Sequence, residues 1–172
     1  MNGLSAMPEL DCRRQAAFYL GLAQTVLPAL AGNVHEGFAS QVVDTCWRSI
    51  EHQDVDGQVL LDLIHSEEDT GVNVIMGAED DRYVWNLWAC LVDAQSVAAY
   101  CAYKAPGDPY LPEMIENIDV EDTFGGFMDS FRAVGGNTEV VAPLREFLAG
   151  LHDDQLTRSV VSEALDRLIN AA

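Results

Sequence analysis

Hydrophobic residues dominate residues 83–103, which read YVWNLWACLVDAQSVAAYCAY and contain no Gly or Pro. As a helix, this stretch would make almost six turns with apolar side chains on nearly every side. Such a helix needs other helices around it, so the pattern predicts a central buried helix at about 82–104. Its polar positions, Asn86, Asp93 and Tyr100, are spaced by seven. They form either a strip exposed to solvent or a buried polar ladder.

Amphipathic stretches before this segment predict further helices. Pro8 suits the first turn of a helix over 8–31, which Pro28 could kink or end. Residues 34–52 place apolar side chains at the i, i+3, i+4 and i+7 positions of a second helix. A short third helix follows, with Asp54 or Asp56 as its N-cap.

After the central helix, residues 105–112 are rich in proline and predict a loop. Hydrophobic periodicity then predicts helices at about 120–134, 138–151 and 154–170. The last two would form an antiparallel hairpin, so residues 1–172 are either one all-α domain or a domain with the hairpin 137–172 as an appendage. No stretch combines strand alternation with hairpin turns. The sequence therefore predicts an all-α irregular bundle of about seven to eight helices around the central one.

Acidic residues outnumber basic ones by 28 to 9, which gives a formal net charge of -19. A chain this acidic repels phosphate groups, so a nucleic acid is excluded as a partner. The same charge attracts basic protein surfaces at a rate that depends on salt. An alternative is that the acidity reflects the composition of the genome or adaptation to a salty cytoplasm.

Four cysteines, Cys12, Cys46, Cys90 and Cys101, have neither metal-binding nor redox-motif spacing and lie within predicted helices. We expect small, reduced core residues and a cytoplasmic protein. No stretch is apolar for long enough to cross a membrane without interruption, so the sequence predicts no membrane association.

Motifs of common enzyme classes are absent: the sequence contains neither G-x-S-x-G nor a phosphate-binding Gly-rich loop. Asp62 and His65 have the spacing of a di-metal bundle ligand pair, but no second pair accompanies them. We therefore expect no catalytic residue, no cofactor and no metal. Asp93 on the central helix requires a partner if it is buried, and Arg48 on the second helix is the candidate. We interpret this pair as structural; the alternative is that Asp93 acts as a general base in a pocket.

Between Arg14 and Asp122 the chain carries an ordered series of short motifs. The series consists of Trp47 with Ile50, Asp56-Gly57, Glu67-Glu68-Asp69, Trp85-Asn86 with Asp93 and Tyr100, and Tyr110-Leu111-Pro112 with Glu116 and Asp119. In this series the chain resembles the immunity-six family, small all-α antitoxins of bacterial polymorphic toxin systems. The resemblance implies a protein that binds a cognate toxin domain, for example a nuclease, and blocks it.

Three hypotheses follow. The first is a monomeric or homodimeric inhibitor whose acidic surface meets a basic toxin site. Its candidate contact residues are Glu67, Glu68, Asp69, Asp80, Asp81, Glu113 and Glu116. The second is a helical enzyme or small-molecule-binding protein with a closed pocket near Asp93. The third is a scaffold module that dimerises through an apolar patch on the C-terminal hairpin.

Overall fold

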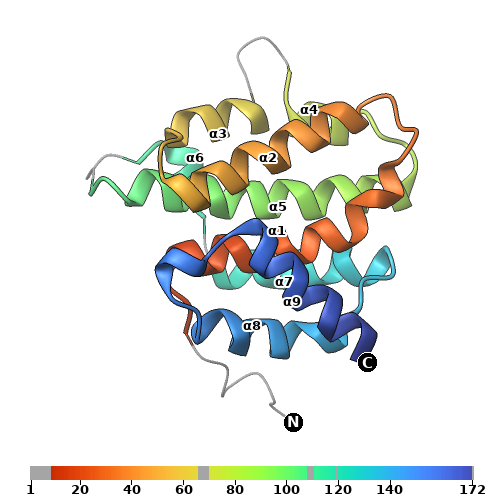
Figure 1. Ribbon diagram of the computed structural model, residues 1–172. Coiled ribbons are helices and arrows are strands. Elements are labelled where there is room, and N and C mark those ends of the chain that lie inside the picture. Colours follow the sequence, from red (N-terminus) through yellow and green to blue (C-terminus); the bar gives the residue numbers. More distant parts are fainter. Residues whose placement is uncertain (1–8, 66–69, 108–110, 119, 172) are drawn as a thin grey trace.

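The computed structural model describes residues 9–65, 70–107, 111–118 and 120–171 (Figure 1). These residues contain nine α-helices, three short 3-10 helices and no strand, which confirms the all-α class. The helices are α1 (Cys12–Val26), η2 (Leu27–Leu30), α2 (Glu36–His52), α3 (Gly57–Ile64), α4 (Val72–Gly77), α5 (Arg82–Lys104), α6 (Glu113–Glu116), α7 (Val120–Ala133), η3 (Thr138–Val140), α8 (Val141–Ala149), η4 (Asp153–Gln155) and α9 (Arg158–Ala171).

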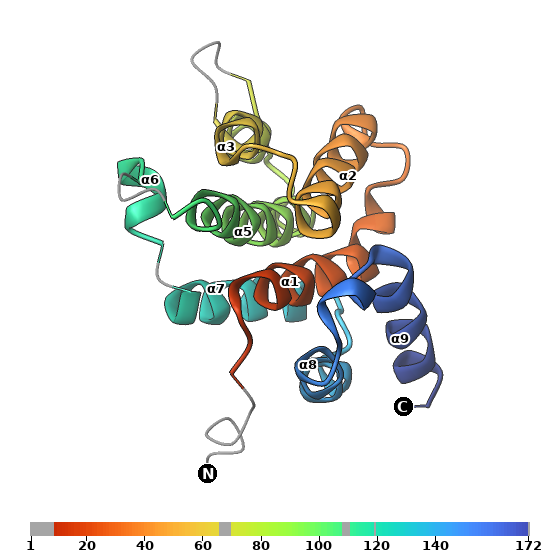
Figure 2. The ribbon, with the colours of Figure 1, turned by 60° about the vertical axis from the view of Figure 1, so that its left-hand side comes forward.

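Helix α5 lies at the centre of the bundle, as its apolar pattern predicts. Helices α2 and α3 cover one side of it, and α1 and α7 cover the other (Figure 2). Trp88 in its middle is fully buried. Asp81 caps the helix, because its carboxylate accepts hydrogen bonds from the backbone N–H groups of Tyr83 at 2.8 Å and Val84 at 3.3 Å. This cap satisfies donors that the first turn leaves unpaired, and it defines where α5 begins.

Helix α1 is held between its neighbours by two consecutive arginines. Arg13 donates hydrogen bonds to the carbonyl oxygen of Ile50 near the end of α2, from Nε at 3.1 Å and from Nη2 at 2.6 Å. Arg14 donates to the carbonyl oxygens of Leu148 at 3.1 Å and Leu151 at 2.6 Å, where α8 ends. Carbonyl groups at helix C-termini lack helical partners and attract cations. The two arginines therefore fix α1 to α2 on one side and to α8 on the other.

The C-terminal helices α8 and α9 pack on α1, on the side away from α5 (Figure 2). Leu144 and Leu148 of α8 and Val161 of α9 belong to the same hydrophobic cluster as the residues around α5. Gly21 of α1 permits this packing, since a Cβ atom there would lie 3.0 Å from Cγ1 of Val161. We propose that residues 137–172 are part of a single domain rather than an appendage.

The structure differs from the sequence prediction at helix α1 and at residues 72–77. Helix α1 begins at Cys12, after its N-cap Asp11, instead of near residue 8, and it ends at Val26, before Pro28, which the prediction allows as an early end. The chain continues as the 3-10 helix η2, which contains Pro28. Proline lacks a backbone N–H, and here it occupies the first turn of the 3-10 helix, where no such donor is needed. The segment Val72–Gly77 forms the helix α4, which the sequence does not predict because a six-residue stretch shows too little periodicity.

The prediction of four reduced cysteines is wrong for two of them. Cys12 in the first turn of α1 and Cys101 in the last turn of α5 form a disulfide, with their Cα atoms 5.4 Å apart. Cys46 and Cys90 are free and buried, and burial raises the pKa of each thiol to about 12. Disulfides persist mainly in oxidising compartments. The cysteines therefore do not support the predicted cytoplasmic location.

A search of the described helices for a membrane-spanning candidate finds none that is both long and apolar enough to cross a bilayer.

Candidate partner-binding surface

The described part of the predicted contact set falls into two separate groups. Asp80 and Asp81 precede α5, whereas Glu113 and Glu116 lie on α6, beside the opposite end of α5 (Figure 1). The acidic segment 67–69 lies outside the described residues. Because α5 has 23 residues, about 33 Å of helix separates the two groups. A single small ligand cannot touch both groups, but a protein surface can.

The members of these groups differ in how freely they can meet a partner. Asp81 is exposed, but its carboxylate already caps α5. Asp80, Glu113 and Glu116 are exposed, and their side chains point away from the core. These three are therefore the described candidates whose charge is most accessible to a partner.

Every basic side chain of the chain contacts a partner within the molecule. Five arginines form ion pairs or charged hydrogen bonds with carboxylates or carbonyl oxygens at the helix ends and helix junctions. They are Arg13 with Ile50, Arg14 with Asp11 and Asp153, Arg48 with Asp54, Arg132 with Asp129, and Arg158 with Asp44. The remaining four lie on an aromatic ring or on a carbonyl oxygen. They are Arg82 over Trp85, Lys104 over Tyr100, Arg145 over Phe18, and Arg167 with Glu163.

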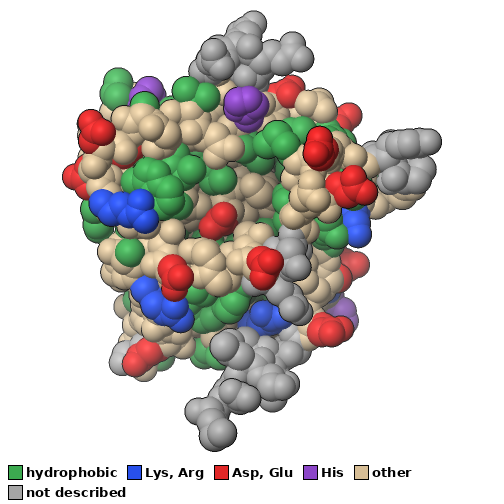
Figure 3. All heavy atoms as spheres, turned by 180° about the vertical axis from the view of Figure 1, so that it is seen from behind, with side chains coloured by type: hydrophobic (Ala, Val, Ile, Leu, Met, Phe, Trp, Pro, Cys, Tyr) green, Lys and Arg blue, Asp and Glu red, His purple; other side chains and the backbone are tan. Residues whose placement is uncertain are grey.

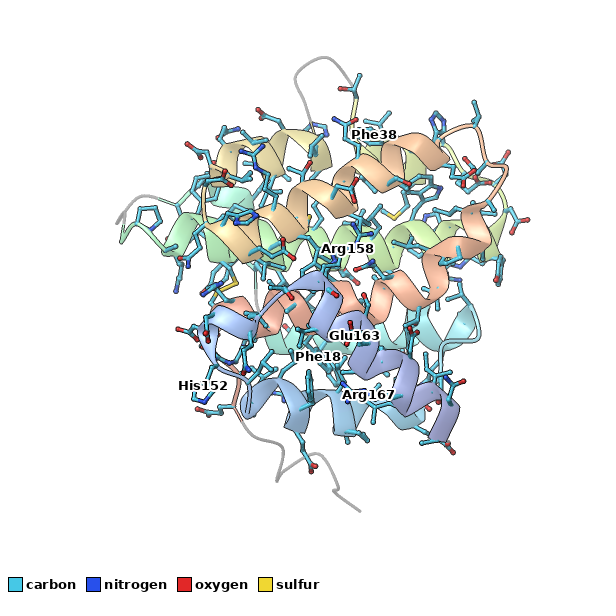
Figure 4. All side chains as sticks on the ribbon, viewed as in Figure 1. Phe18, Phe38, His152, Arg158, Glu163 and Arg167 are labelled. Atoms are coloured by element: carbon cyan, nitrogen blue, oxygen red, sulfur yellow. A yellow bond between two sulfur atoms is a disulfide. The ribbon has the colours of Figure 1, made fainter. Side chains whose placement is uncertain are left out.

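Helix α9 illustrates this use of basic groups (Figure 4). Arg158, at the start of α9, points towards α2, and its Nη1 lies 2.5 Å from Oδ1 of Asp44. Its backbone N–H donates to Oε1 of Glu51 at 2.6 Å. Further along α9, Nε of Arg167 donates to the carbonyl oxygen of Glu163 at 3.2 Å. Arg158 therefore joins α9 to α2, whereas Arg167 makes its contact within α9.

The predicted pair of Arg48 and Asp93 is not present. Nη2 of Arg48 lies 2.6 Å from Oδ2 of Asp54, and both side chains are exposed. This pair raises the pKa of Arg48 and lowers the pKa of Asp54 through their hydrogen bond. The positions of Arg48 and Asp93 on neighbouring helices allow a pair, but the turn after α2 brings Asp54 back towards Arg48. The two residues therefore have separate environments.

Asp93 instead lines a groove of about 620 Å³ between α5 and α7. From α5, the groove is lined by side chains at helical spacing, among them Trp85, Ala89 and Asp93. From α7 it is lined by residues including Gly126 and Ser130. Both helices border the face shown in Figure 3, where hydrophobic patches and acidic side chains lie side by side. The groove thus combines apolar walls with a carboxylate.

Small residues form part of the groove lining: Ala89 on α5 and Gly126 and Ala133 on α7. A Cβ atom at Gly126 would meet no other atom within 4 Å, so the groove is open at this position. Glycine inside a helix is destabilising by roughly 0.5–1 kcal/mol relative to alanine. No close packing in the described residues requires glycine here.

Desolvation raises the pKa of Asp93 to about 7, because the half-buried carboxylate loses water without gaining a compensating partner. Within the described residues Asp93 has no hydrogen bond and no cation within ion-pair distance. The nearby groups that its charge influences are Tyr19 on α1 and Cys90 on α5, whose pKa values are raised mainly by burial and also by Asp93. At neutral pH, Asp93 is therefore poised between its charged and neutral forms.

Two residues that line the groove, Trp85 and Asn86, are not among the contact residues predicted from the sequence. Trp85 is half-buried, and the guanidinium carbon of Arg82 lies 4.2 Å from the centroid of its ring. The spacing of three between Arg82 and Trp85 on one helix is a signal that could have identified this stacked pair. Asn86 is buried, with 8 % of its surface exposed, and its Nδ2 donates a hydrogen bond of 2.8 Å to the carbonyl oxygen of Arg82. The polar positions of α5 are thus neither a fully exposed strip nor a continuous buried ladder.

A second hollow, of about 440 Å³, lies between α1, α2, α3 and α5 beside the disulfide. Its charged groups already have internal partners: Arg13 is bonded to Ile50, and Asp54 is bonded to Arg48. Tyr103 at its edge donates a hydrogen bond of 2.6 Å to Oε1 of Gln58. This hollow therefore offers less unsatisfied chemistry than the groove at Asp93.

Among the described residues, no group of three or more His, Cys, Asp or Glu side chains is arranged so that it could hold a metal ion. The large surplus of carboxylates favours rapid association with basic surfaces. The family model for Immunity protein Imm6 matches residues 14–134, and the chain belongs to this family. The match ends directly after α7, so α8 and α9 lie beyond it. Neither the curated proteins nor the solved structures include a match.

Proposed function

We propose that this immunity protein binds and neutralises a cognate toxin domain of a bacterial polymorphic toxin system, as an inhibitor and not as an enzyme. Membership of the Imm6 family supports binding to a toxin. The observation that supports an acidic contact is the surplus of 28 acidic over 9 basic residues, together with the exposure of Asp80, Glu113 and Glu116. The chain can therefore present negative charge to a partner.

The partner that this charge fits best is a basic protein surface, such as the phosphate-binding site of a nuclease. Carboxylates placed against such a site would replace the phosphates of its substrate and exclude the nucleic acid. Long-range attraction would also speed the encounter of the two proteins. The affinity would come mainly from a few buried side chains at the centre of the interface.

The experiment that tests this proposal is co-purification of the tagged protein from its native bacterium, first in low and then in moderate salt, followed by mass spectrometry. The expected result is recovery of the C-terminal domain of a large secreted or contact-delivered protein. Co-expression should then abolish the toxicity of that domain. Absence of a partner in cells that express such toxins would refute the immunity function.

Charge-reversal variants can locate the acidic contact. One variant would carry Glu113→Lys and Glu116→Lys on α6, and another would replace the acidic segment 67–69 by lysines. Asp81 is left unchanged because it caps α5. We expect at least one of these variants to weaken the complex in low salt. If both variants bind the toxin as well as the wild type does, the proposal of an acidic contact is wrong, whereas the proposed immunity function stands.

A small-molecule-binding protein or enzyme is the second candidate function, and the groove with a raised pKa at Asp93 is the observation that favours it. The groove is open, and among the described residues no hydrogen bond joins the hydroxyl group of its Ser130 to Asp93 or Asp129. A scaffold that dimerises through the hairpin is less favoured. Among the described hairpin residues, Ile169 alone is a large hydrophobic residue with high exposure, at 39 %. We therefore keep the monomeric inhibitor as the main proposal.

We also propose the cytoplasm as the compartment in which the protein meets a nuclease toxin, because the nucleic acid substrate is there. The Cys12–Cys101 disulfide is the observation that opposes this location. Trapping the thiols in living cells with an alkylating reagent, followed by mass spectrometry, distinguishes the two cases. Alkylated Cys12 and Cys101 would agree with the cytoplasm, whereas an intact disulfide would indicate an oxidising compartment.

A further inference from the structure

We infer, on the basis of the proposed function, that the groove between α5 and α7 receives a basic side chain of the toxin, with Asp93 as its counter-ion. The groove would bind one specific arginine or lysine side chain of the partner. The acidic residues that precede α5 and those on α6 attract a partner at a distance, whereas the contact with Asp93 is local and half-buried.

The shape of the groove fits a long side chain with an apolar stem. Trp85, Ala89 and Val92 line it from α5. Lysine and arginine bury their methylene groups against such surfaces and keep the charged end at a polar group. Asp93 lies one turn beyond Ala89 on the same face of α5, so an aliphatic stem along this wall brings its cation to the carboxylate.

The charge of the groove also fits a cation. Asp93 has no basic partner among the described residues, and a carboxylate in a half-buried position gains most from a cation that reaches it. The two other charged residues of the lining are Arg82 and Asp129. Arg82 is stacked on Trp85, about 16 Å from Asp93 along the axis of α5, and Asp129 pairs with Arg132 at 3.3 Å. Neither neutralises Asp93.

Gly126 provides independent support. It lies in the interior of α7, lines the groove, and has free space where a Cβ atom would be. Gly125 has the same free space but does not line the groove, so the distinguishing feature of Gly126 is its place in the lining. A larger side chain at Gly126 would take up room that the side chain of a partner needs.

Protonation of Asp93 should control this contact. The charged and titratable groups around it are Tyr19 on α1, Cys90 and Arg82 on α5, and Asp129 on α7. Of these, Tyr19 and Cys90 are neutral near pH 7, because burial raises the pKa of Tyr19 further above its usual value and raises the pKa of Cys90 to about 12. The carboxylate of Asp93 must be charged to hold a cation, so binding should strengthen between pH 6 and pH 8. Binding should in turn lower the pKa of Asp93.

The first test uses a defined probe with the complete protein. N-acetyl-arginine amide is titrated into the isotope-labelled protein, and the backbone and Trp85 indole resonances are followed by NMR. N-acetyl-citrulline amide, which has nearly the same shape but no charge, is the control ligand. We expect the arginine probe to shift groove resonances at pH 8, the citrulline probe not to do so, and Asp93→Asn to abolish the effect. Equal shifts with both probes, or no shift with either, would overturn the inference.

The second test uses the co-purified toxin domain and three variants. Asp93→Asn removes the charge, and Gly126→Leu fills the groove. Gly125→Leu is the matched control, because it makes the same change one position earlier in α7, where the residue does not line the groove. We expect Asp93→Asn and Gly126→Leu each to weaken binding about tenfold or more and Gly125→Leu to leave it unchanged. Circular dichroism of each variant verifies that it is folded.

The outcomes separate this inference from the proposed function. If the wild type retains the toxin and both groove variants retain it equally well, the groove inference is wrong and the immunity function stands. If the wild type retains no toxin, the immunity function fails, and the arginine probe still decides whether the groove binds a cation. If the groove binds a free guanidinium or ammonium metabolite tightly and no toxin binds, the inference that a toxin side chain occupies the groove is wrong.

Discussion

Asp93 lies where a carboxylate is partly removed from water but not given a cation. In the unfolded chain its pKa is near 3.8, whereas burial raises the pKa in the folded protein to about 7. Between these two values the folded protein binds more protons than the unfolded chain. Asp93 therefore contributes stability that is fully present below about pH 4 and lost as the pH rises through about 7.

Replacing Asp93 by asparagine should remove this pH dependence. The difference in free energy of unfolding between Asp93→Asn and the wild type should grow from pH 4 to pH 8, and the variant should be more stable by about 2 kcal/mol at pH 8. This figure is reduced from the full effect of the pKa shift because the carboxylate is half-exposed. Urea unfolding at several pH values measures it. Asp166→Asn, at an exposed position of α9, is the control. A difference that stays constant with pH would show that Asp93 has an ordinary pKa.

At the scale of helices, the contact of α1 with α9 depends on one residue. A Cβ atom at Gly21 would lie 3.0 Å from Cγ1 of Val161 and 3.3 Å from Cδ1 of Leu165. Gly21→Leu should therefore separate the two helices and lower the free energy of unfolding by about 1–3 kcal/mol. Gly37→Leu in α2 is the control, because a Cβ atom there meets nothing within 4 Å. If urea unfolding shows the same stability for both variants, α9 does not pack on α1 in this way.

The disulfide joins the first turn of α1 to the last turn of α5 across 89 residues of sequence. Closing so long a loop restricts the unfolded chain, so replacing both Cys12 and Cys101 by serine should lower the free energy of unfolding by about 2–4 kcal/mol. Urea unfolding of the two proteins without reductant measures the difference. With reductant present, the wild type should approach the variant. Four reactive thiols in the denatured wild type, instead of two, would show that the bond does not form.

The positions of most helices can be predicted from the sequence. The predicted central helix, at about 82–104, agrees with the observed Arg82–Lys104 because its apolar surface, its lack of glycine and proline, and the preceding Asp81 all indicate the same helix. The groove was accessible only in part. The periodicity of α5 places Asp93 and Trp85, but it does not reveal that α7 packs beside them or that Gly126 leaves space there. The Cys12–Cys101 bond was inaccessible for the same reason, since pairing depends on how distant helices meet.

At the scale of the whole molecule, the net charge of -19 and the internal use of the basic side chains act together. Arginines placed at helix ends and junctions stabilise the bundle, as Arg13 and Arg14 do for α1. Even with all nine cations counted, acidic residues remain in a surplus of 19. The field of the molecule is therefore negative over distances beyond a single contact, and salt screens it within about 10 Å at 0.1 M ionic strength.

Salt should therefore separate the long-range and the local parts of toxin binding. We expect the association rate constant to fall about tenfold or more between 0.05 M and 0.5 M salt, because exposed charges are screened. Neutralising Glu113 and Glu116 should reduce this salt dependence. Asp93→Asn should instead raise the dissociation rate constant by a factor that changes little with salt, since a half-buried pair is screened less. Stopped-flow association and surface plasmon resonance dissociation measure the two rates. If Asp93→Asn acts only on association and its effect vanishes in high salt, Asp93 belongs to the general acidic surface, and the groove does not hold a specific cation.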